Sequence, residues 1–168
     1  MELAKYKEVM IWNEKKYRFT PNKKLVSGNA PLGESFICQK YILKIIRDCA
    51  KALQYLHDEA GIIHRDIKPQ NVLLCSNKHL PDEMKEAPFT AKLCDFGVSE
   101  KLKTPFDEND VISKTAGTFH FFAPECCDAN TETHSGRAAD IWALGVTMYC
   151  LLFNELPFWN HDNVMNEF

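Results

Sequence analysis

Two long segments of the chain carry the hydrophobic pattern of helices. Between Phe36 and His57, apolar residues recur at steps of three and four, which places them on one face of a helix; they are Ile42, Ile45, Ile46, Cys49, Leu53 and Leu56. We therefore predict an amphipathic helix over Phe36–His57 that is broken at Gly61. The segment Arg137–Phe153 is mostly apolar, which predicts a buried core helix followed by a turn at Leu156-Pro157.

Two short apolar runs, Asn71–Cys75 and Ala91–Cys94, have the length of strands. The polar stretch between them, residues 76–90, contains two prolines, so we predict a hairpin with a long loop. Residues 1–35 show no clear periodicity, and residues 95–125 have the charged and small residues of a loop. Together these patterns predict an α+β fold that is mostly helical, with a small β-hairpin.

Composition and charge limit the possible functions. The chain has 168 residues, of which 45% are hydrophobic, and a net charge of −3, so one domain or one lobe is expected. The mild acidity argues against a nucleic-acid partner. No apolar run reaches the roughly 20 residues of a membrane span. The N-terminus lacks the apolar run of a signal peptide, and the seven cysteines form no Cys-x-x-Cys pair. We expect a reducing, cytoplasmic location.

Four motifs between residues 64 and 145 carry the chemistry. They are His64–Asn71 (HRDIKPQN), Asp95–Gly97 (DFG), Gly117-Thr118 followed by Ala123–Glu125 (APE), and Asp140–Gly145 (DIWALG). Each motif alone would be weak, but the four occur in one order and each in a fitting local context. In this arrangement the chain resembles the protein kinases. The resemblance implies a kinase-like fold and the transfer of a phosphoryl group from ATP.

The resemblance implies a catalytic role for Asp66, Lys68 and Asn71. Asp66 would accept or orient the proton of the substrate hydroxyl, and Lys68 would face the transferred phosphate. Asn71 and Asp95 would hold Mg²⁺ through oxygen atoms, which suit a hard cation. Leu73 would form part of the floor beneath the adenine.

A second set of residues would support this site if the resemblance holds. The set comprises His64, Phe96, Thr118, Glu125 and Asp140. His64 and Phe96 would stack in an apolar column. Asp140 would hydrogen-bond the backbone of the catalytic loop, the segment His64–Asn71. Met1–Ala4 resembles the hinge between the two lobes of a kinase, which makes Glu2 and Ala4 candidate nucleotide-binding residues.

The motifs also indicate a substrate class. The loop Asp66–Asn71 has the form Asp-x-Lys-Pro-x-Asn, which is typical of serine/threonine kinases, and Thr118 would bridge Asp66 and Lys68. A protein with a Ser or Thr acceptor is therefore the expected partner. The segments Ala91–Ser99 and Ser135–Cys150 are similar to the calcium/calmodulin-dependent protein kinase kinases.

Control of the site is expected at Arg65, which precedes the catalytic aspartate. Kinases of this kind often need a phosphate on the loop to neutralise this arginine. Thr115 is the favoured acceptor and Ser113 the second, which would make an upstream kinase a partner. Alternatively, the acidic run Asp107–Asp110 could pair with Arg65 without modification, or could be a solvated part of the loop.

The resemblance covers only the middle of a kinase domain. Before Asp66 the sequence has no glycine-rich loop and no strand with the phosphate-gripping lysine, and the chain stops shortly after the buried helix. We therefore expect residues 1–168 to be a partial kinase domain that lacks the N-terminal lobe and the last helices. Loss of several charge-stabilising groups, each worth roughly 10²–10³ in rate, would leave the isolated chain almost inactive. Two alternatives remain open, namely a non-catalytic kinase-like scaffold and an incomplete version of a longer protein.

Overall fold

The computed structural model describes residues 7–26, 36–77, 87–102, 110–112, 116–128, 130 and 132–158. The N-terminal half contains, in chain order, β1 (Met10–Asn13), β2 (Arg18–Pro21), α1 (Gln39–Gln54), the π-helical turn η1 (Tyr55–Ala60), β3 (Ile62–Ile63), the 3₁₀ turn η2 (Pro69–Asn71) and β4 (Val72–Ser76). The remainder contains β5 (Phe89–Leu93), β6 (Glu100–Lys101), β7 (Val111–Ile112), the 3₁₀ turn η4 (Phe119–Phe121), α2 (Pro124–Cys127), β8 (His134–Ser135) and α3 (Gly136–Phe153).

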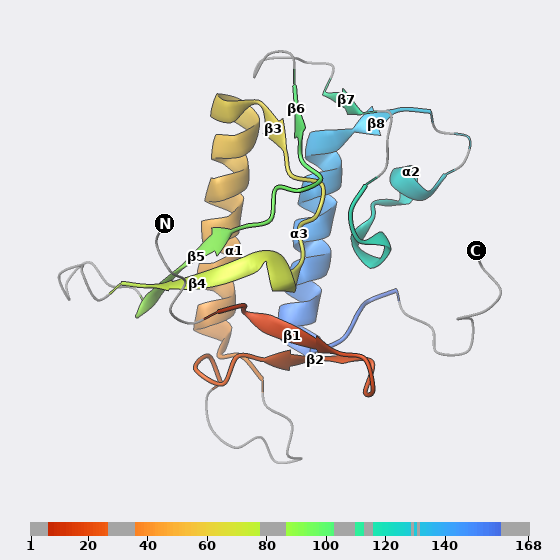
Figure 1. The fold of residues 1–168 in the computed structure, drawn as a ribbon. Coiled ribbons are helices and arrows are strands. Elements are labelled where there is room, and N and C mark those ends of the chain that lie inside the picture. Colours follow the sequence, from red (N-terminus) through yellow and green to blue (C-terminus); the bar gives the residue numbers. More distant parts are fainter. Residues whose placement is uncertain are drawn as a thin grey trace.

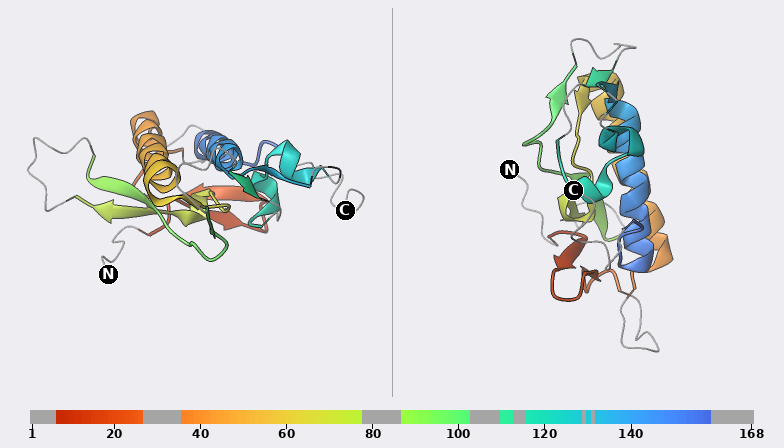
Figure 2. Two further views of the ribbon diagram at one scale, coloured as in Figure 1. Left: turned by 90° about the horizontal axis from the view of Figure 1, so that it is seen from above. Right: turned by 90° about the vertical axis from the view of Figure 1, so that its right-hand side faces the viewer.

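The two long helices, α1 and α3, lie side by side and form one layer of the molecule (Figures 1 and 2). The strands and the connecting loops form the other layer, as the two views of Figure 2 show. Both long helices begin and end close to their predicted limits. The apolar stripe of α1 faces the core, with Ile42, Ile45, Cys49 and Leu53 buried. Gly61 ends the turn after α1 with a φ of 64°, a left-handed conformation that favours glycine.

The predicted hairpin is confirmed as the antiparallel pair β4–β5, in which Val72 lies opposite Leu93. Asp48 joins this hairpin to α1, because its Oδ2 accepts a hydrogen bond from the Ala91 backbone N–H at 2.9 Å. The chain segment before β1 extends the hairpin, since the Val9 N–H donates to the Val72 carbonyl at 3.0 Å. The end of β4 nearest the motif His64–Asn71 is thus fixed on both sides.

The structure has more strand pairings than the predicted hairpin, because the described residues form four two-stranded pairings. The additional pairs are β1–β2, β3–β6 and β7–β8. The first lies in the segment that shows no clear periodicity, and β6 and β7 lie in the segment predicted as a loop. None of the helices in the described segments is long and apolar enough to cross a membrane.

Candidate active site

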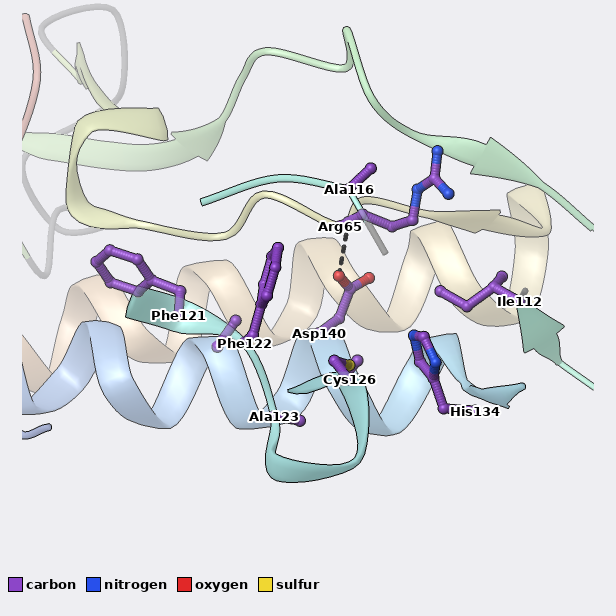
Figure 3. A pocket seen from close by; sticks show the side chains of 11 residues that line it. Arg65, Ile112, Ala116, Phe121, Phe122, Ala123, Cys126, His134 and Asp140 are labelled. Carbon is purple, nitrogen blue, oxygen red and sulfur yellow. Dashed lines mark hydrogen bonds between the residues drawn. The ribbon is translucent and has the colours of Figure 1, made fainter. Parts of the chain in front are cut away.

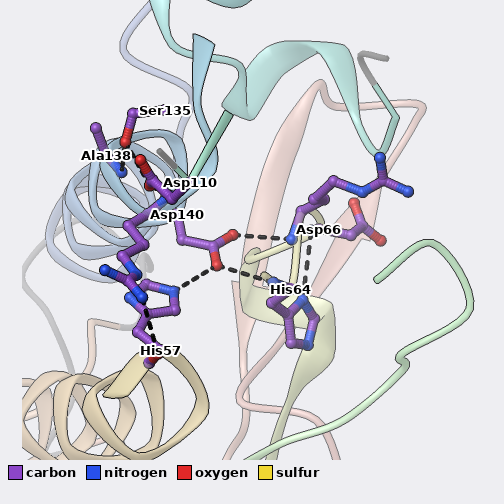
Figure 4. Close-up of polar contacts among 9 residues, drawn as sticks. His57, His64, Asp66, Asp110, Ser135, Ala138 and Asp140 are labelled. Carbon is purple, nitrogen blue, oxygen red and sulfur yellow. Dashed lines mark hydrogen bonds and ion pairs between the residues drawn. The ribbon is translucent and has the colours of Figure 1, made fainter. Parts of the chain in front are cut away.

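Asp140 holds the loop between β3 and η2 from inside the protein. It lies in the second turn of α3 and is 0% exposed. Its Oδ2 accepts hydrogen bonds from the His64 backbone N–H at 2.8 Å and from His57 Nε2 at 2.8 Å (Figure 4). Its Oδ1 accepts from the Arg65 backbone N–H, also at 2.8 Å. This carboxylate therefore fixes the backbone immediately before Asp66.

Asp66 is the centre of a compact polar cluster. It is 8% exposed. Its Oδ1 accepts a hydrogen bond from Thr118 Oγ1 at 2.7 Å, and its Oδ2 accepts from Asn71 Nδ2 at 2.9 Å. Lys68 Nζ lies 2.7 Å from Asp66 Oδ2 and donates to Thr118 Oγ1 at 2.7 Å. Burial raises the pKa of Asp66, but the hydrogen bonds from Lys68 and Thr118 outweigh it and hold the pKa below its usual value. Asp66 is thus ionised at neutral pH.

Gly117 allows Thr118 to approach the catalytic loop. Its φ is 118°, a conformation that side chains rarely adopt. A Cβ at this position would lie 2.2 Å from the Arg65 carbonyl oxygen. Only glycine fits here, because a side chain at position 117 would overlap the Arg65 carbonyl. The close approach of Gly117 to Arg65 places the hydroxyl of the next residue, Thr118, beside Asp66.

Asn71 and Asp95 lie at the same end of the β4–β5 hairpin. The Cys94 backbone N–H donates to the Asn71 carbonyl at 3.0 Å, so Asp95 follows directly after a residue bonded to Asn71. Asp95 is exposed and has a φ of 65°. Its Oδ1 accepts from the Gly97 N–H at 3.3 Å. Among the described residues, no three His, Cys, Asp or Glu side chains are grouped to hold a metal ion.

His64 connects the catalytic loop to the Asp95–Gly97 turn. Its ring lies against that of Phe96, with 4.9 Å between centroids. Its Nε2 donates to the Cys94 carbonyl at 3.1 Å, and its Nδ1 accepts from the Asp66 backbone N–H at 3.3 Å. A ring that donates at one nitrogen and accepts at the other is neutral. Burial lowers the pKa of His64 from its ordinary value, against the opposing effect of Asp140.

We expect acidification to destabilise the fold as the pH falls through about 6.5, the ordinary histidine pKa. Below this value the unfolded chain binds a proton that folded His64 resists, so the free energy of unfolding decreases as pH falls. Burial also lowers the pKa of His120, which acts in the same direction. Urea unfolding between neutral pH and about pH 5.5 measures this slope. The His64→Phe variant should have a shallower slope, and an unchanged slope would contradict a contribution from His64.

Arg65 pairs with a carboxylate that the sequence did not indicate. Its Nη1 lies 2.6 Å from Glu100 Oε2, and its Nε donates to the Val98 carbonyl at 2.5 Å. The alternative partner for Arg65 was the acidic run Asp107–Asp110. Asp110 bonds elsewhere, because its Oδ2 accepts hydrogen bonds from Ser135 Oγ and from the Arg137 N–H at the start of α3. Residues 107–109 and the candidate acceptors Ser113 and Thr115 lie outside the described residues.

The other candidate residues lie in several places. Leu73 is half-buried on β4, opposite Lys92 and bridged to Glu8. Glu125 is half-buried in α2, and Phe96 is 45% exposed. Glu2 and Ala4 lie outside the described residues.

A small cavity lies between the catalytic loop, η4 and α3 (Figure 3). Its lining includes Arg65, Cys126, His134 and Asp140, and its volume is about 30 Å³. That volume exceeds the roughly 10–15 Å³ that one water molecule needs, so the cavity admits a few water molecules at most. The cavity is therefore too small for a nucleotide.

Sequence reasoning missed two residues of the site, His57 and Glu100. His57 follows Leu56 on the buried side of η1 and is 6% exposed. Its helical spacing from Leu53 was a usable signal, because a polar residue on an apolar stripe needs a buried partner. Glu100 had no such signal, since its place depends on the two-residue pairing of β3 with β6.

Comparison with known proteins gives both a family match and close relatives. The model of the family "Protein kinase domain" matches residues 15–167. Serine/threonine-protein kinase GRIK2 of Arabidopsis thaliana is 39% identical over 140 residues, which are 83% of this chain and 30% of that protein. Serine/threonine-protein kinase TOS3 of Saccharomyces cerevisiae is 41% identical over 133 residues, 76% of this chain and 22% of that protein. The calcium/calmodulin-dependent protein kinase kinase cmkC of Emericella nidulans is 42% identical over 116 residues, 69% of this chain and 20% of that protein. The chain thus spans less than a third of the length of these relatives.

Proposed function

This chain belongs to the protein kinase family, and from that premise we propose that the whole protein phosphorylates serine or threonine hydroxyls of other proteins with ATP as donor. The observation that carries the proposal is the cluster around Asp66. An ionised carboxylate, a lysine ammonium and a threonine hydroxyl lie within hydrogen-bonding distance of one another. This is the set that in-line transfer needs at the acceptor side.

Each member of the cluster has a separate task in the proposed reaction. Asp66 accepts or orients the proton of the substrate hydroxyl, and its lowered pKa keeps it in the accepting form. Lys68 holds positive charge beside Asp66, where it faces the phosphoryl group. Thr118 keeps Asp66 and Lys68 at a fixed separation, because its hydroxyl donates to one and accepts from the other.

Asn71 and Asp95 fit the proposed magnesium ion by their chemistry. The Asn71 amide nitrogen donates to the carbonyl and the carboxylate of Asp66, so the amide oxygen is the group left to bind a cation. Asp95 adds an exposed carboxylate at the same end of the hairpin. Mg²⁺ takes few protein oxygens and completes its coordination with water and substrate phosphates. The bound ion would neutralise phosphate charge, and Leu73 would lie under the adenine.

We also propose a cytoplasmic location and an upstream kinase as a partner. The location is supported by the seven cysteines, all of which are free thiols in the structure. The upstream kinase would act on Thr115 or Ser113. It is supported only by the position of these hydroxyls shortly before Gly117 in the sequence.

The test of the proposed function is transfer of radiolabelled γ-phosphate from MgATP to a serine peptide by the whole protein. Incorporation that requires Mg²⁺ and is abolished by EDTA is the expected result. A protein that gives no incorporation on Ser and Thr peptides, yet binds other proteins, would instead be the non-catalytic scaffold. Thermal unfolding with and without MgATP adds a second readout, because a nucleotide bound to the native state raises its melting temperature.

Glu100 is expected to supply part of the negative charge that Arg65 needs. Replacing it by Gln should lower the transfer rate about two- to fivefold, a modest loss because the Glu100 side chain is 42% exposed. Glu59→Gln, at an exposed carboxylate on η1, is the matched control and should leave the rate unchanged. Thr115→Ala tests the alternative that a phosphate on Thr115 supplies the negative charge for Arg65. If that variant is inactive while Glu100→Gln is fully active, a loop phosphate and not Glu100 neutralises Arg65.

A further inference from the structure

Asp110, the last residue of the acidic run, ties its part of the chain to the first turn of α3 (Figure 4). Its Oδ2 accepts hydrogen bonds from Ser135 Oγ at 2.7 Å and from the Arg137 N–H at 2.8 Å. Its backbone carbonyl accepts from the Gly136 N–H at 2.9 Å. The first N–H groups of a helix have no partner inside the helix, and the N-terminus of a helix favours negative charge. A carboxylate at this point is therefore well placed to hold the chain against α3.

The strand β7 continues this attachment. In its pairing with β8, Ile112 lies opposite His134, and the Ile112 side chain is 2% exposed. Gly136 leaves no room for a side chain, because a Cβ there would lie 2.8 Å from Ile63 Cγ2 and 3.4 Å from Ile112 Cδ1. β7, the start of α3 and β3 are therefore packed against one another, immediately before the catalytic loop.

The first two turns of α3 thus hold both parts of the proposed acceptor site. Asp140, in the second turn, bonds the backbone of the catalytic loop, and Asp110 bonds the first turn. Only three residues separate Ile112 from Ala116, so these two residues lie at most about 14 Å apart, the length of a fully extended chain. Because Thr118 follows two residues later, the place of β7 limits where its hydroxyl can lie.

We propose that Asp110 is a positioning residue for phosphoryl transfer, which keeps Thr118 in its place beside Asp66. The inference rests on the proposed function and adds to it a residue outside the hydrogen-bonded cluster. Asp110 acts through Thr118, because its Oδ2 bonds α3 and not the groups that react. Without this carboxylate, residues 110–112 would be held to α3 mainly by backbone hydrogen bonds and by the two-residue pairing of β7 with β8. Two short strands alone are barely stable in water.

The kinetic test compares kcat of the whole protein on a serine peptide at saturating MgATP. Asp110→Ala should lower kcat about tenfold, because a small displacement of a positioned group slows transfer strongly. KM for ATP should stay unchanged, because the hydrogen bonds of Asp110 go to α3 and not to the β4–β5 hairpin. Asp110→Asn keeps an oxygen acceptor and should lose only about twofold. In the Thr118→Ala background, Asp110→Ala should change kcat less than about twofold, since the two substitutions disturb one contact.

Amide hydrogen exchange measures the attachment without phosphoryl transfer. The Phe121 N–H donates to the Thr118 carbonyl at 3.0 Å in η4, so its exchange reports how firmly this part of the chain is held. In the Asp110→Ala protein we expect this amide to exchange about tenfold faster. The matched control is Asp128→Ala, because Asp128 Oδ1 also accepts from a backbone N–H and from a side chain, both of Asn130. The control makes the same change in charge and should alter neither kcat nor the exchange at Phe121.

The proposal is overturned if Asp110→Ala leaves kcat or the exchange at Phe121 unchanged, or if the losses of Asp110→Ala and Thr118→Ala multiply in the double variant. If Asp110→Ala does not fold, Ser135→Ala takes its place, because it removes one of the two donors to Asp110 Oδ2. It should speed the exchange at Phe121, and an unchanged rate there overturns the proposal. A wild-type protein that gives no phosphoryl transfer overturns the proposed function, whereas the exchange at Phe121 still decides whether Asp110 holds the segment that carries Thr118.

Discussion

Replacement of Asp66 by Asn is expected to lower the rate of phosphoryl transfer about 10²–10⁴-fold, the usual contribution of a positioned general base. The amide has the shape of the carboxylate but cannot accept the hydroxyl proton. It also removes the negative charge beside Lys68 Nζ, which lies 2.7 Å from Asp66 Oδ2. The measurement is kcat of the whole protein at saturating MgATP and peptide. The thermal unfolding of the variant shows whether the loop stays folded.

The control for this substitution is Asp58→Asn. Asp58 is an exposed carboxylate on η1, so its loss should leave kcat unchanged while making the same change in net charge. If D66N keeps more than about a tenth of the wild-type kcat, Asp66 does not accept a proton in the slow step. The loss would then be no larger than that of an ordinary hydrogen bond.

The elements that could be predicted from the sequence are those whose pattern is local. The apolar stripe of α1 and the apolar run of α3 each extend over several helical turns, so the local sequence is enough to predict both helices. β4 and β5 are five-residue strands bounded by polar segments, and the prediction placed each within two residues at either end. In these elements a single face or a whole segment is buried, and hydrophobicity reports burial directly.

The β1–β2 hairpin could not be predicted with the same ease. Its strands are four residues long, and the turn between them carries Lys15 and Lys16, which conceal the alternation. Ile11 is exposed and Met10 buried, so an apolar residue faces solvent in the middle of the pattern. Contacts with η2 and with the chain after α3 place this hairpin. The two-residue strands β3, β6, β7 and β8 are shorter than any periodicity and depend wholly on tertiary contacts.

The same distinction applies to the candidate site. The resemblance of the motifs to the protein kinases named Asp66, Lys68, Asn71 and Thr118, which the structure brings into one hydrogen-bonded cluster. Residues inside a single loop are close because the chain is short, and the family resemblance added Thr118 from farther along the sequence. The partner of Arg65 could not be found in this way. The register of β3 with β6 brings Glu100 opposite Ile63, and no local pattern encodes that register.

Asp140 is expected to give the largest loss of stability of any single site. Removal of its carboxylate by Ala leaves the buried backbone N–H groups of His64 and Arg65 without acceptors, together with His57. At about 1–3 kcal/mol for each unsatisfied buried group, we expect a loss of about 3–5 kcal/mol, comparable to breaking a buried ion pair. Urea unfolding of the 168-residue chain at neutral pH measures it. Since a domain has only about 5–15 kcal/mol in total, the Ala variant will be close to unfolded at room temperature.

The Asp140→Asn variant makes the prediction testable even if the Ala variant does not fold. The amide keeps one oxygen acceptor but turns an NH₂ group toward a donor, so at least one of the three hydrogen bonds must break. Asp110→Asn is the matched comparison, because Asp110 bonds Ser135 and the Arg137 N–H at the start of the same helix and should cost about 1 kcal/mol, as a helix cap does. If Asp140→Asn costs no more than Asp110→Asn, Asp140 is not what fixes the catalytic loop. In that case the position of Asp66 must depend on its own contacts with Thr118, Lys68 and Asn71.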